Sequence, residues 1–427
     1  MTERARVVVR IALRNVRRQA RRSLLTASAM VLGIALLMFV RALEAGGHVM
    51  YVESAVRMGT GHVSLEHPEY AATRDLVDRI PAEYLELATE AISAATTPDE
   101  LRAVFPRVTV GGLVQSASSS IPASVSGVDP AREAPISFLR ESIVEGRFLE
   151  PGDRLEAIVG VGVAERLRVE PGSRLVLMAE DIEGEIESQL VLVTGIFRTG
   201  IPEVDRGVVQ LPLETAREWL ALGEDATSLS AVLTSDRRTG EIARDVRARL
   251  EREGVEPGAV AVRPWWEAMP DLHAGLQADT VQTYIMLLIL LAIVALAVVN
   301  SVLMAVLNRT REFGVLRSLG LNRRSVGGMV IVEGSVLALL SGIAGMGLGL
   351  AVAFGVFRDG VDISFALGDG ELAFAGAIVD PVIQPVLQTG DAIAIFLIVV
   401  AIGVLASLYP AWHATRIEPA EAMKTDD

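Results

Sequence analysis

The residue types that bind metal ions come closest together at His62, Glu66 and His67, in a chain with five histidines and no cysteine. On a strand, His62 and Glu66 would share a face while His67 would point away. We therefore favour a fortuitous surface cluster over a zinc site. The other histidines are isolated in the sequence, and we expect structural roles for them: His48, His273 and His413. The sequence thus predicts no metal centre.

Catalytic and nucleotide-binding motifs are absent from the sequence. It holds no Gly-x-x-x-x-Gly-Lys-Ser/Thr segment for nucleotide phosphates, no Gly-x-Ser-x-Gly elbow and no His-Glu-x-x-His pair. Without cysteine there is no disulfide framework and no thiol chemistry. The formal charge of −14 argues against nucleic-acid binding. We expect no catalytic residue and no cofactor in this chain, and a membrane-anchored enzyme is disfavoured.

The stretch from Arg309 to Gly320 instead has the pattern of a binding segment. If Glu312 to Leu319 is helical, Phe313, Leu316 and Leu319 fall on one face at spacings of three. The strip is flanked by charged side chains, and two glycines leave room for close approach: Arg309, Arg311, Glu312, Arg317, Gly314 and Gly320. Such a helix suits docking into a groove on a soluble partner. The alternative is an interfacial helix that dips its apolar side into lipid.

Apolar runs on either side of this segment are long enough to cross a bilayer, which takes about 20 residues. The chain is 51% hydrophobic, with a mean hydropathy of +0.42. We predict four transmembrane segments, at residues 24–43, 283–306, 326–357 and 392–410. The first could be read as a signal peptide, but its basic flank is long and no small-residue cleavage site follows. We therefore expect a retained span.

Arginines set the expected orientation, because loops rich in arginine stay in the cytoplasm. The loop 307–325 carries five arginines, whereas the loop 358–391 carries one arginine against six acidic residues. The first loop is therefore predicted to lie inside and the second outside, with both termini inside. Residues 1–23 are predicted to form a basic amphipathic helix on membrane lipid, and 411–427 a cytoplasmic tail.

The third span contains both a charge and a row of small residues. A helix from Val326 to Phe357 would be about 48 Å long, well beyond a hydrocarbon core of about 30 Å. We therefore place Glu333 near the cytoplasmic boundary, and a proton-coupling carboxylate is the alternative. Ser341, Gly345 and Gly349 repeat every four residues and predict close helix contact.

Residues 44–282, between the first two spans, are enough for an outward-facing domain with one or two parts. Alternation predicts strands at 61–66, 108–128, 156–160, 174–178 and 189–197, and periodicity predicts helices at 75–95, 162–167, 213–220 and 237–253. The pattern indicates an α+β domain with an inserted part near 131–225. Helical extensions at 42–57 and 270–283 would form a stalk.

Two motifs carry a resemblance to a known family. The segment Arg309-Thr-Arg-Glu-Phe-Gly-Val-Leu-Arg-Ser-Leu-Gly320 resembles the coupling helix of FtsX/MacB-like ABC transporter permeases. The segment from Tyr409 to Met423 is similar to the closing motif of the same superfamily. Four stretches of the large domain resemble landmarks of the LolC/LolE-type lipoprotein-releasing permeases: 145–149, 158–167, 195–200 and 265–272.

The resemblance implies an α-helical membrane protein with four transmembrane helices and a MacB-like periplasmic core domain. It further implies a second permease copy and a cytoplasmic ABC ATPase that binds ATP and Mg²⁺, with the coupling residues given above as its contact. ATP hydrolysis would then move the outer domain, and the favoured substrates are lipoproteins leaving the inner membrane. The alternatives are a peptide or drug efflux permease, and an FtsX-like regulator of a cell-wall hydrolase.

Overall fold

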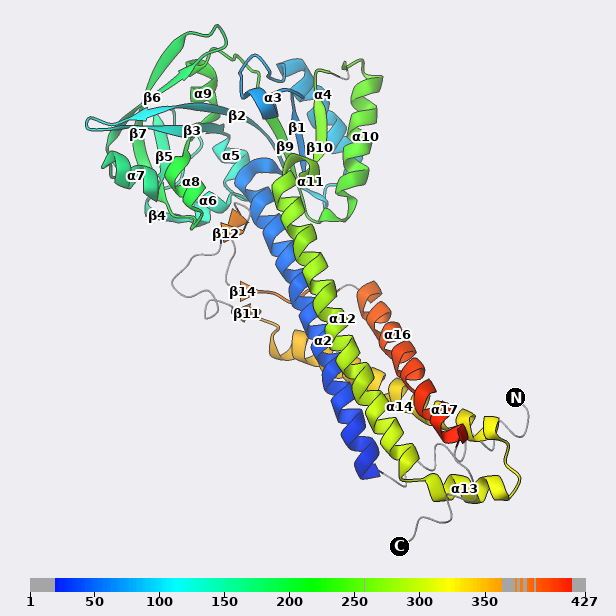
Figure 1. Ribbon diagram of the computed structural model, residues 1–427. Helices are drawn as coiled ribbons and strands as arrows, with labels where there is room; N and C mark the ends of the chain where they lie inside the picture. The colour runs from blue at the N-terminus through cyan, green and yellow to red at the C-terminus, as the bar shows by residue number, and fades with distance from the viewer. Residues whose placement is uncertain are drawn as a thin grey trace. The chain divides into compact units, whose positions relative to one another are not determined.

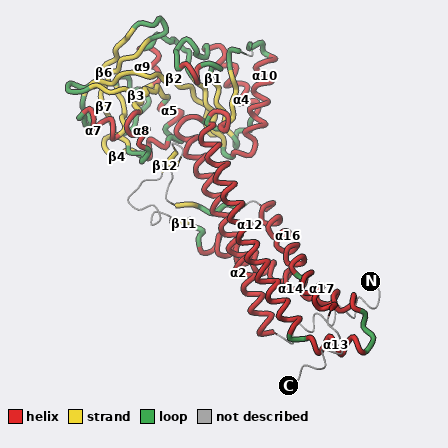
Figure 2. Tube along the Cα trace, viewed as in Figure 1, coloured by secondary structure: helices red, strands yellow, loops and turns green. Residues whose placement is uncertain are grey.

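The computed structural model describes residues 20–256, 258–362, 373–374, 377–378, 382–387 and 389–416. The predicted helix over 1–23 and the tail after 416 therefore fall almost wholly outside the described residues. The chain divides into two compact units. The helical unit comprises Met1–His48, Ala278–Ile363 and Val382–Asp427, and the strand unit comprises Val49–Gln277 and Ser364–Pro381. Figure 2 shows the contrast in secondary structure between the units.

Among the residues that the structure describes, four helices are long and apolar enough to cross a membrane, in agreement with the four predicted spans. They are α2 (Ala20–Ala55), α12 (Pro270–Leu307), α14 (Arg323–Ala351) and α16 (Thr389–Ala406) (Figure 1). A π turn, Val352–Val356, extends α14. Apolar side chains on these helices stay exposed, as a lipid environment allows. Both α2 and α12 continue as helix through the stretches that the sequence predicts as extensions.

The last membrane helix ends earlier than the sequence predicts. The predicted span runs to residue 410, but α16 ends at Ala406 and α17 (Leu408–Arg416) begins after a turn at Ser407. Pro410 lies in the first turn of α17, where its missing N–H would have no helical partner. Ser407 is fully buried and donates its hydroxyl to the Gly403 carbonyl at 2.8 Å. The Ser407 amide still donates to the Gly403 carbonyl at 3.2 Å, and the Ala411 amide donates to the Ser407 carbonyl at 3.1 Å, so the break is confined to the turn before Pro410.

The strand unit is built on one continuous set of ten strands. These are β1 (Val63–Glu66), β2 (Leu101–Gln115), β3 (Ser120–Val128), β4 (Ile143–Gly146), β5 (Glu156–Gly160), β6 (Arg174–Glu180), β7 (Ile186–Phe197), β8 (Val208–Pro212), β9 (Ser228–Leu233) and β10 (Ala261–Pro264). The order is β10-β1-β9-β2-β3-β8-β5-β7-β4, and β6 pairs with both β2 and β7. Alternation places Ile121, Ala123 and Val125 of β3 in the core, as predicted.

Strand β2 divides this unit into two parts. Its first half, Leu101 to Arg107, pairs with β9, and its second half pairs with β3 and β6. The ladder β2-β3-β8-β5-β7-β6 returns to β2 and so closes on itself, while β10 and β4 stay at the two ends of the strand order. The predicted inserted part near 131–225 therefore begins too far along the sequence, because the closed ladder already starts in the second half of β2.

Short helices cover the strands. They are α3 (Tyr70–Thr73), α4 (Ala82–Ala95), α5 (Pro130–Glu133), α6 (Phe138–Glu141), α7 (Val161–Leu167), α8 (Pro202–Gly207), α9 (Leu213–Trp219), α10 (Thr239–Arg252) and α11 (Trp265–Ala268). The predicted helix over 75–95 is only partly correct. It begins at Ala82, because Pro81 occupies the N-cap and Ile80 forms a β-bridge with Ala226.

Candidate functional site

The segment between α12 and α14 folds as a short helix, α13 (Thr310–Ser318). Arg309 occupies the N-cap position, and the Phe313 amide donates to the Arg309 carbonyl at 3.0 Å. The helix ends in a glycine cap. Gly320 has φ +95°, its amide donates to the Arg317 carbonyl at 3.0 Å, and the Leu321 amide donates to the Leu316 carbonyl at 3.1 Å. This is the paired bonding of a Schellman motif. Gly320 therefore ends α13, and close approach of a partner is not what requires it.

Phe313, Leu316 and Leu319, which the sequence places on one helical face, do not form one exposed strip. Phe313 is 1% exposed and lies in a cluster with side chains from α2, α12, α14 and α17. Leu316 is half-buried against the same cluster, and Gly314 is buried. Leu319 lies past the helix end and is 79% exposed. Helical periodicity identified an apolar face, but most of that face packs on the protein itself.

Arg309 fixes α13 to the membrane helix that follows it. Its Nη1 donates to Glu333 Oε2 on α14 at 3.0 Å, and its Nε donates to Glu312 at 2.9 Å. The guanidinium lies over the Phe313 ring, 5.3 Å from the ring centroid. The Arg309 side chain is 5% exposed and that of Glu333 is 21% exposed, so solvent screens this pair only weakly. The sequence predicts a contact residue at Arg309 and an interfacial carboxylate at Glu333, but not the ion pair between them.

The solvent-exposed side of α13 carries both charged and apolar side chains. Arg311 and Glu312 are exposed, Val315 is 44% exposed, and Leu319 follows at the helix end. Arg317 is half-buried. These side chains carry no reactive constellation. Their arrangement suits a protein contact in which apolar anchors are ringed by charges.

The row of small residues on α14 faces α2. Ser341, Gly345 and Gly349 are all buried. A Cβ at Gly345 would lie 2.7 Å from Ile34 Cβ, and a Cβ at Gly349 would lie 2.7 Å from Met38 Cβ. Real Cβ atoms do not approach so closely, so the two helices require glycine here.

Another face of α14 packs on α16 and on the turn before α17. A Cβ at Gly342 would lie 3.0 Å from the Phe396 ring, and a Cβ at Gly334 would overlap the Ser407 hydroxyl. Together with the contacts to α2, these make α14 the central helix of the helical unit.

The predicted surface cluster in the strand unit is not a cluster. His62 is 2% exposed, and its Nδ1 accepts the Leu233 amide at 3.1 Å. His67 pairs instead with Asp78 at 3.3 Å, and Glu66 lies 3.9 Å from Arg263. Burial lowers the pKa of His62, because the charged imidazolium would lose its hydration. His62 is therefore a neutral core residue.

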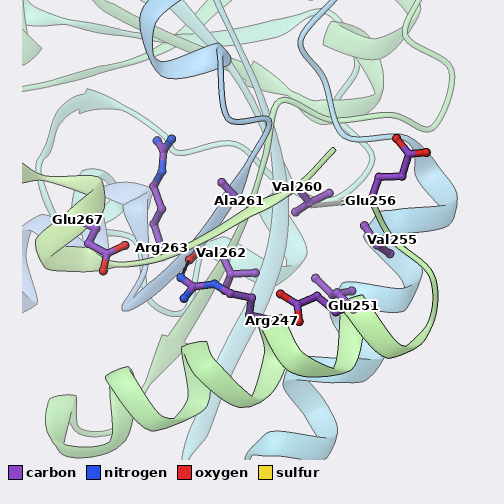
Figure 3. A pocket seen from close by; sticks show the side chains of 10 residues that line it. Arg247, Glu251, Val255, Glu256, Val260, Ala261, Val262, Arg263 and Glu267 are labelled. Carbon is purple, nitrogen blue, oxygen red and sulfur yellow. Dashed lines mark hydrogen bonds between the residues drawn. The ribbon is translucent and has the colours of Figure 1, made fainter. Parts of the chain in front are cut away.

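One hollow of the strand unit lies between α10 and β10 (Figure 3). Its volume is about 290 Å³, and Arg247 and Glu251 from α10 face Arg263 and Glu267 across it. Arg247 donates to the Val262 carbonyl at 2.6 Å and so closes one side. The lining mixes charges of both signs and has no convergent set of reactive groups.

Comparison with known proteins identifies the two parts of the chain. Residues 284–419 match the family model described as FtsX-like permease C-terminal, and residues 23–249 match the MacB-like periplasmic core domain. The chain is 24% identical over 346 residues to the lipoprotein-releasing system transmembrane protein LolC of Xylella fastidiosa, covering 78% of this chain and 80% of that protein. LolC of Neisseria meningitidis is 25% identical over 331 residues, covering 75% of this chain and 78% of LolC.

A relative of different domain content matches almost the whole chain. The macrolide export ATP-binding/permease protein MacB of Agrobacterium fabrum is 23% identical over 425 residues, which cover 95% of this chain but only 58% of MacB. The family models and these relatives agree with the four membrane helices and the α+β strand unit. The chain therefore belongs to the FtsX-like permeases of ABC transporters that carry a MacB-like periplasmic core domain.

Proposed function

We propose that this permease is driven by a separate ABC ATPase, which docks in the cytoplasm on the solvent-exposed side of α13. The observation that carries the proposal is the placement of α13. It lies between two membrane-spanning helices, its inner face is anchored by Phe313 and Arg309, and Val315 and Leu319 remain exposed. An anchored helix with exposed apolar side chains suits a groove on a soluble partner. A lipid-dipping helix would have no need of the ion pair to Glu333.

Docking is tested by replacing the exposed apolar residues at α13 with aspartate, because these substitutions leave the buried core unchanged. The intact permease is purified together with a co-expressed ABC ATPase. Val315→Asp with Leu319→Asp should reduce the recovered ATPase at least tenfold, since each change buries a carboxylate in the interface. Val77→Asp, at a 63% exposed residue of the strand unit, is the matched control and should change nothing. Full recovery of the ATPase with the double variant would refute docking on this side of α13.

The orientation has its own test, because the chain has no native cysteine. Ser318→Cys on α13 should react with a membrane-impermeant maleimide only after the membrane is opened. Ser93→Cys, on α4 of the strand unit, should react in intact spheroplasts. Both residues are exposed, so accessibility to the reagent reports sidedness. Labelling of Ser318→Cys from outside would reverse the topology and remove the ATPase from α13.

For the substrate, we propose lipoproteins that leave the inner membrane through movement of the extracytoplasmic domain. The match to LolC over three quarters of both chains supports this choice. The strand unit also exposes an apolar sheet face, where β2, β6 and β7 present Leu113, Val176, Met178, Leu190 and Leu192. Such a face suits contact with an apolar, lipid-modified cargo.

Crosslinking distinguishes this substrate from the alternatives. A photoreactive residue at Leu190 or Leu192 should capture lipoproteins in cells, whereas one at the exposed Glu187 of the same strand should capture fewer. Capture of a cell-wall hydrolase instead would favour the regulator. The MacB match over 95% of the chain favours efflux as the second candidate. Loss of peptide or drug resistance on deletion, without lipoprotein capture, would support it.

A further inference from the structure

Three potential metal ligands meet between two helices of the helical unit: Glu44 and His48 of α2, and Asp279 of α12. The His48 Nε2 lies 3.0 Å from Asp279 Oδ2 and 4.0 Å from Glu44 Oε1. Glu44 and His48 are four residues apart, so they project from the same face of α2. His48 is isolated in the sequence, because the partner that it contacts here, Asp279, is 231 residues away.

One carboxylate oxygen of Glu44 is available to bind a ligand. Its side chain is 6% exposed, and Oε1, the atom that faces His48, has no hydrogen-bond donor among the described residues. Arg41 contacts the other oxygen, Oε2, and also bonds Asp391 at 3.0 Å. A buried carboxylate oxygen with no partner is unfavourable by about 1–3 kcal/mol or more. A cation beside Oε1 would remove that penalty.

The charges around this point favour a divalent cation. Arg41 supplies one positive charge, whereas Glu44, Asp279 and Asp391 supply three negative charges. With a neutral imidazole at His48, two negative charges remain uncompensated. One divalent ion would neutralise them, and deprotonated carboxylates with a neutral imidazole are the forms that bind metals.

We propose that Glu44, His48 and Asp279 bind one divalent transition-metal ion, with Zn²⁺ as the best fit. Zinc takes imidazole nitrogen and carboxylate oxygen at about 2.0–2.2 Å, so two tetrahedral ligands lie about 3.4 Å apart. The distances of 3.0 and 4.0 Å lie on either side of that value. Calcium and magnesium prefer oxygen ligands alone, which disfavours them beside His48. Water would complete the coordination.

Such an ion would tie α2 to α12 near the start of α12, whereas α13 follows the end of the same helix. The two helices would then be held by a bond that depends on metal supply.

The test is direct metal binding by the full-length protein in lipid nanodiscs. The protein carries no polyhistidine tag, because such a tag binds zinc itself. After chelator treatment and dialysis, isothermal titration with Zn²⁺ should give one site per chain, and Ca²⁺ should give none. His48→Gln and Asp279→Asn should each weaken binding by at least about tenfold. His273→Gln, at a histidine of α12 outside the cluster, should keep the wild-type affinity.

A second variant keeps the proposal testable if His48→Gln folds poorly. In this cysteine-free chain, His48→Cys should restore zinc binding, and with Co²⁺ it should give the near-ultraviolet band of a cobalt–thiolate bond. Absence of a stoichiometric zinc site in the wild type would overturn the proposal. Unchanged zinc affinity in Asp279→Asn would overturn it as well.

Discussion

Breaking the pair between Arg309 and Glu333 should loosen α13 from the membrane helices. Arg309→Met keeps an unbranched apolar stem but leaves the largely buried Glu333 without its 3.0 Å partner. The loss of a charged hydrogen bond and of the contact with the Phe313 ring predicts a destabilisation of about 2–4 kcal/mol. Glu333→Gln keeps an acceptor oxygen for Arg309, so its expected effect is smaller, about 1–2 kcal/mol.

A double-mutant cycle isolates the pair itself. The four proteins are unfolded in mixed detergent micelles, and their free energies of unfolding are obtained from the far-ultraviolet circular dichroism. The double variant should be less destabilised than the sum of the single variants by about 1.5–3 kcal/mol. Arg324→Met, at an exposed residue of α14, is the matched control and should stay within about 0.5 kcal/mol of the wild type.

Additive effects would refute this reasoning. If the two changes sum to within about 0.5 kcal/mol, the ion pair contributes nothing specific and α13 is held by Phe313 alone. A large effect of the control would show that any loss of positive charge on this side destabilises the protein. Neither result is compatible with a tether made by these two side chains.

Three further changes test other contacts. Gly345→Ala places a Cβ against α2 and should destabilise the helical unit by about 1–3 kcal/mol in the same unfolding assay, whereas Gly347→Ala, with no atom within 4 Å, should be nearly neutral. Gly320→Ala forces an unfavourable φ and should cost about 1 kcal/mol or more. Because the pKa of buried His62 is below its ordinary 6.5, the unfolded state takes up the proton first, and stability should fall as pH drops below 6.5. His62→Gln should remove that part of the slope in thermal unfolding between pH 7.5 and 5.

Much of the fold follows from local patterns in the sequence. Apolar runs predict the membrane helices because lipid selects for length and composition. Strand β5 occupies the predicted residues 156–160, and α10 lies within the predicted 237–253. Each element buries one face, so its apolar residues recur with the period of a strand or of a helix. The prediction failed at 75–81, where Pro81 and the bridge of Ile80 to a distant strand override an apolar helical pattern.

The site was less predictable, because its contacts join residues far apart in the chain. Periodicity placed Phe313 on an apolar face but could not say whether that face meets a partner or the protein itself. Arg309 and Glu333 are 24 residues apart, and His48 and Asp279 are 231 apart. A charged residue in an apolar span is a signal that a partner exists. Which residue is that partner depends on how the helices pack, and a single sequence does not show this.

The helices of the helical unit gain little stability from apolar contact with one another, because lipid chains solvate leucine as well as a neighbouring helix does. Their arrangement must therefore depend on close backbone approach and on polar contacts. Helix α14 has both. Gly345 and Gly349 bring it against α2, Gly334 brings it against Ser407, and Glu333 joins it to α13 through Arg309. Close-packed contacts of this kind shift together, since separating them opens voids and leaves a charge unpaired. We therefore expect a displacement of α13 to reach α2 through α14, as our proposal of an ATPase-driven permease requires.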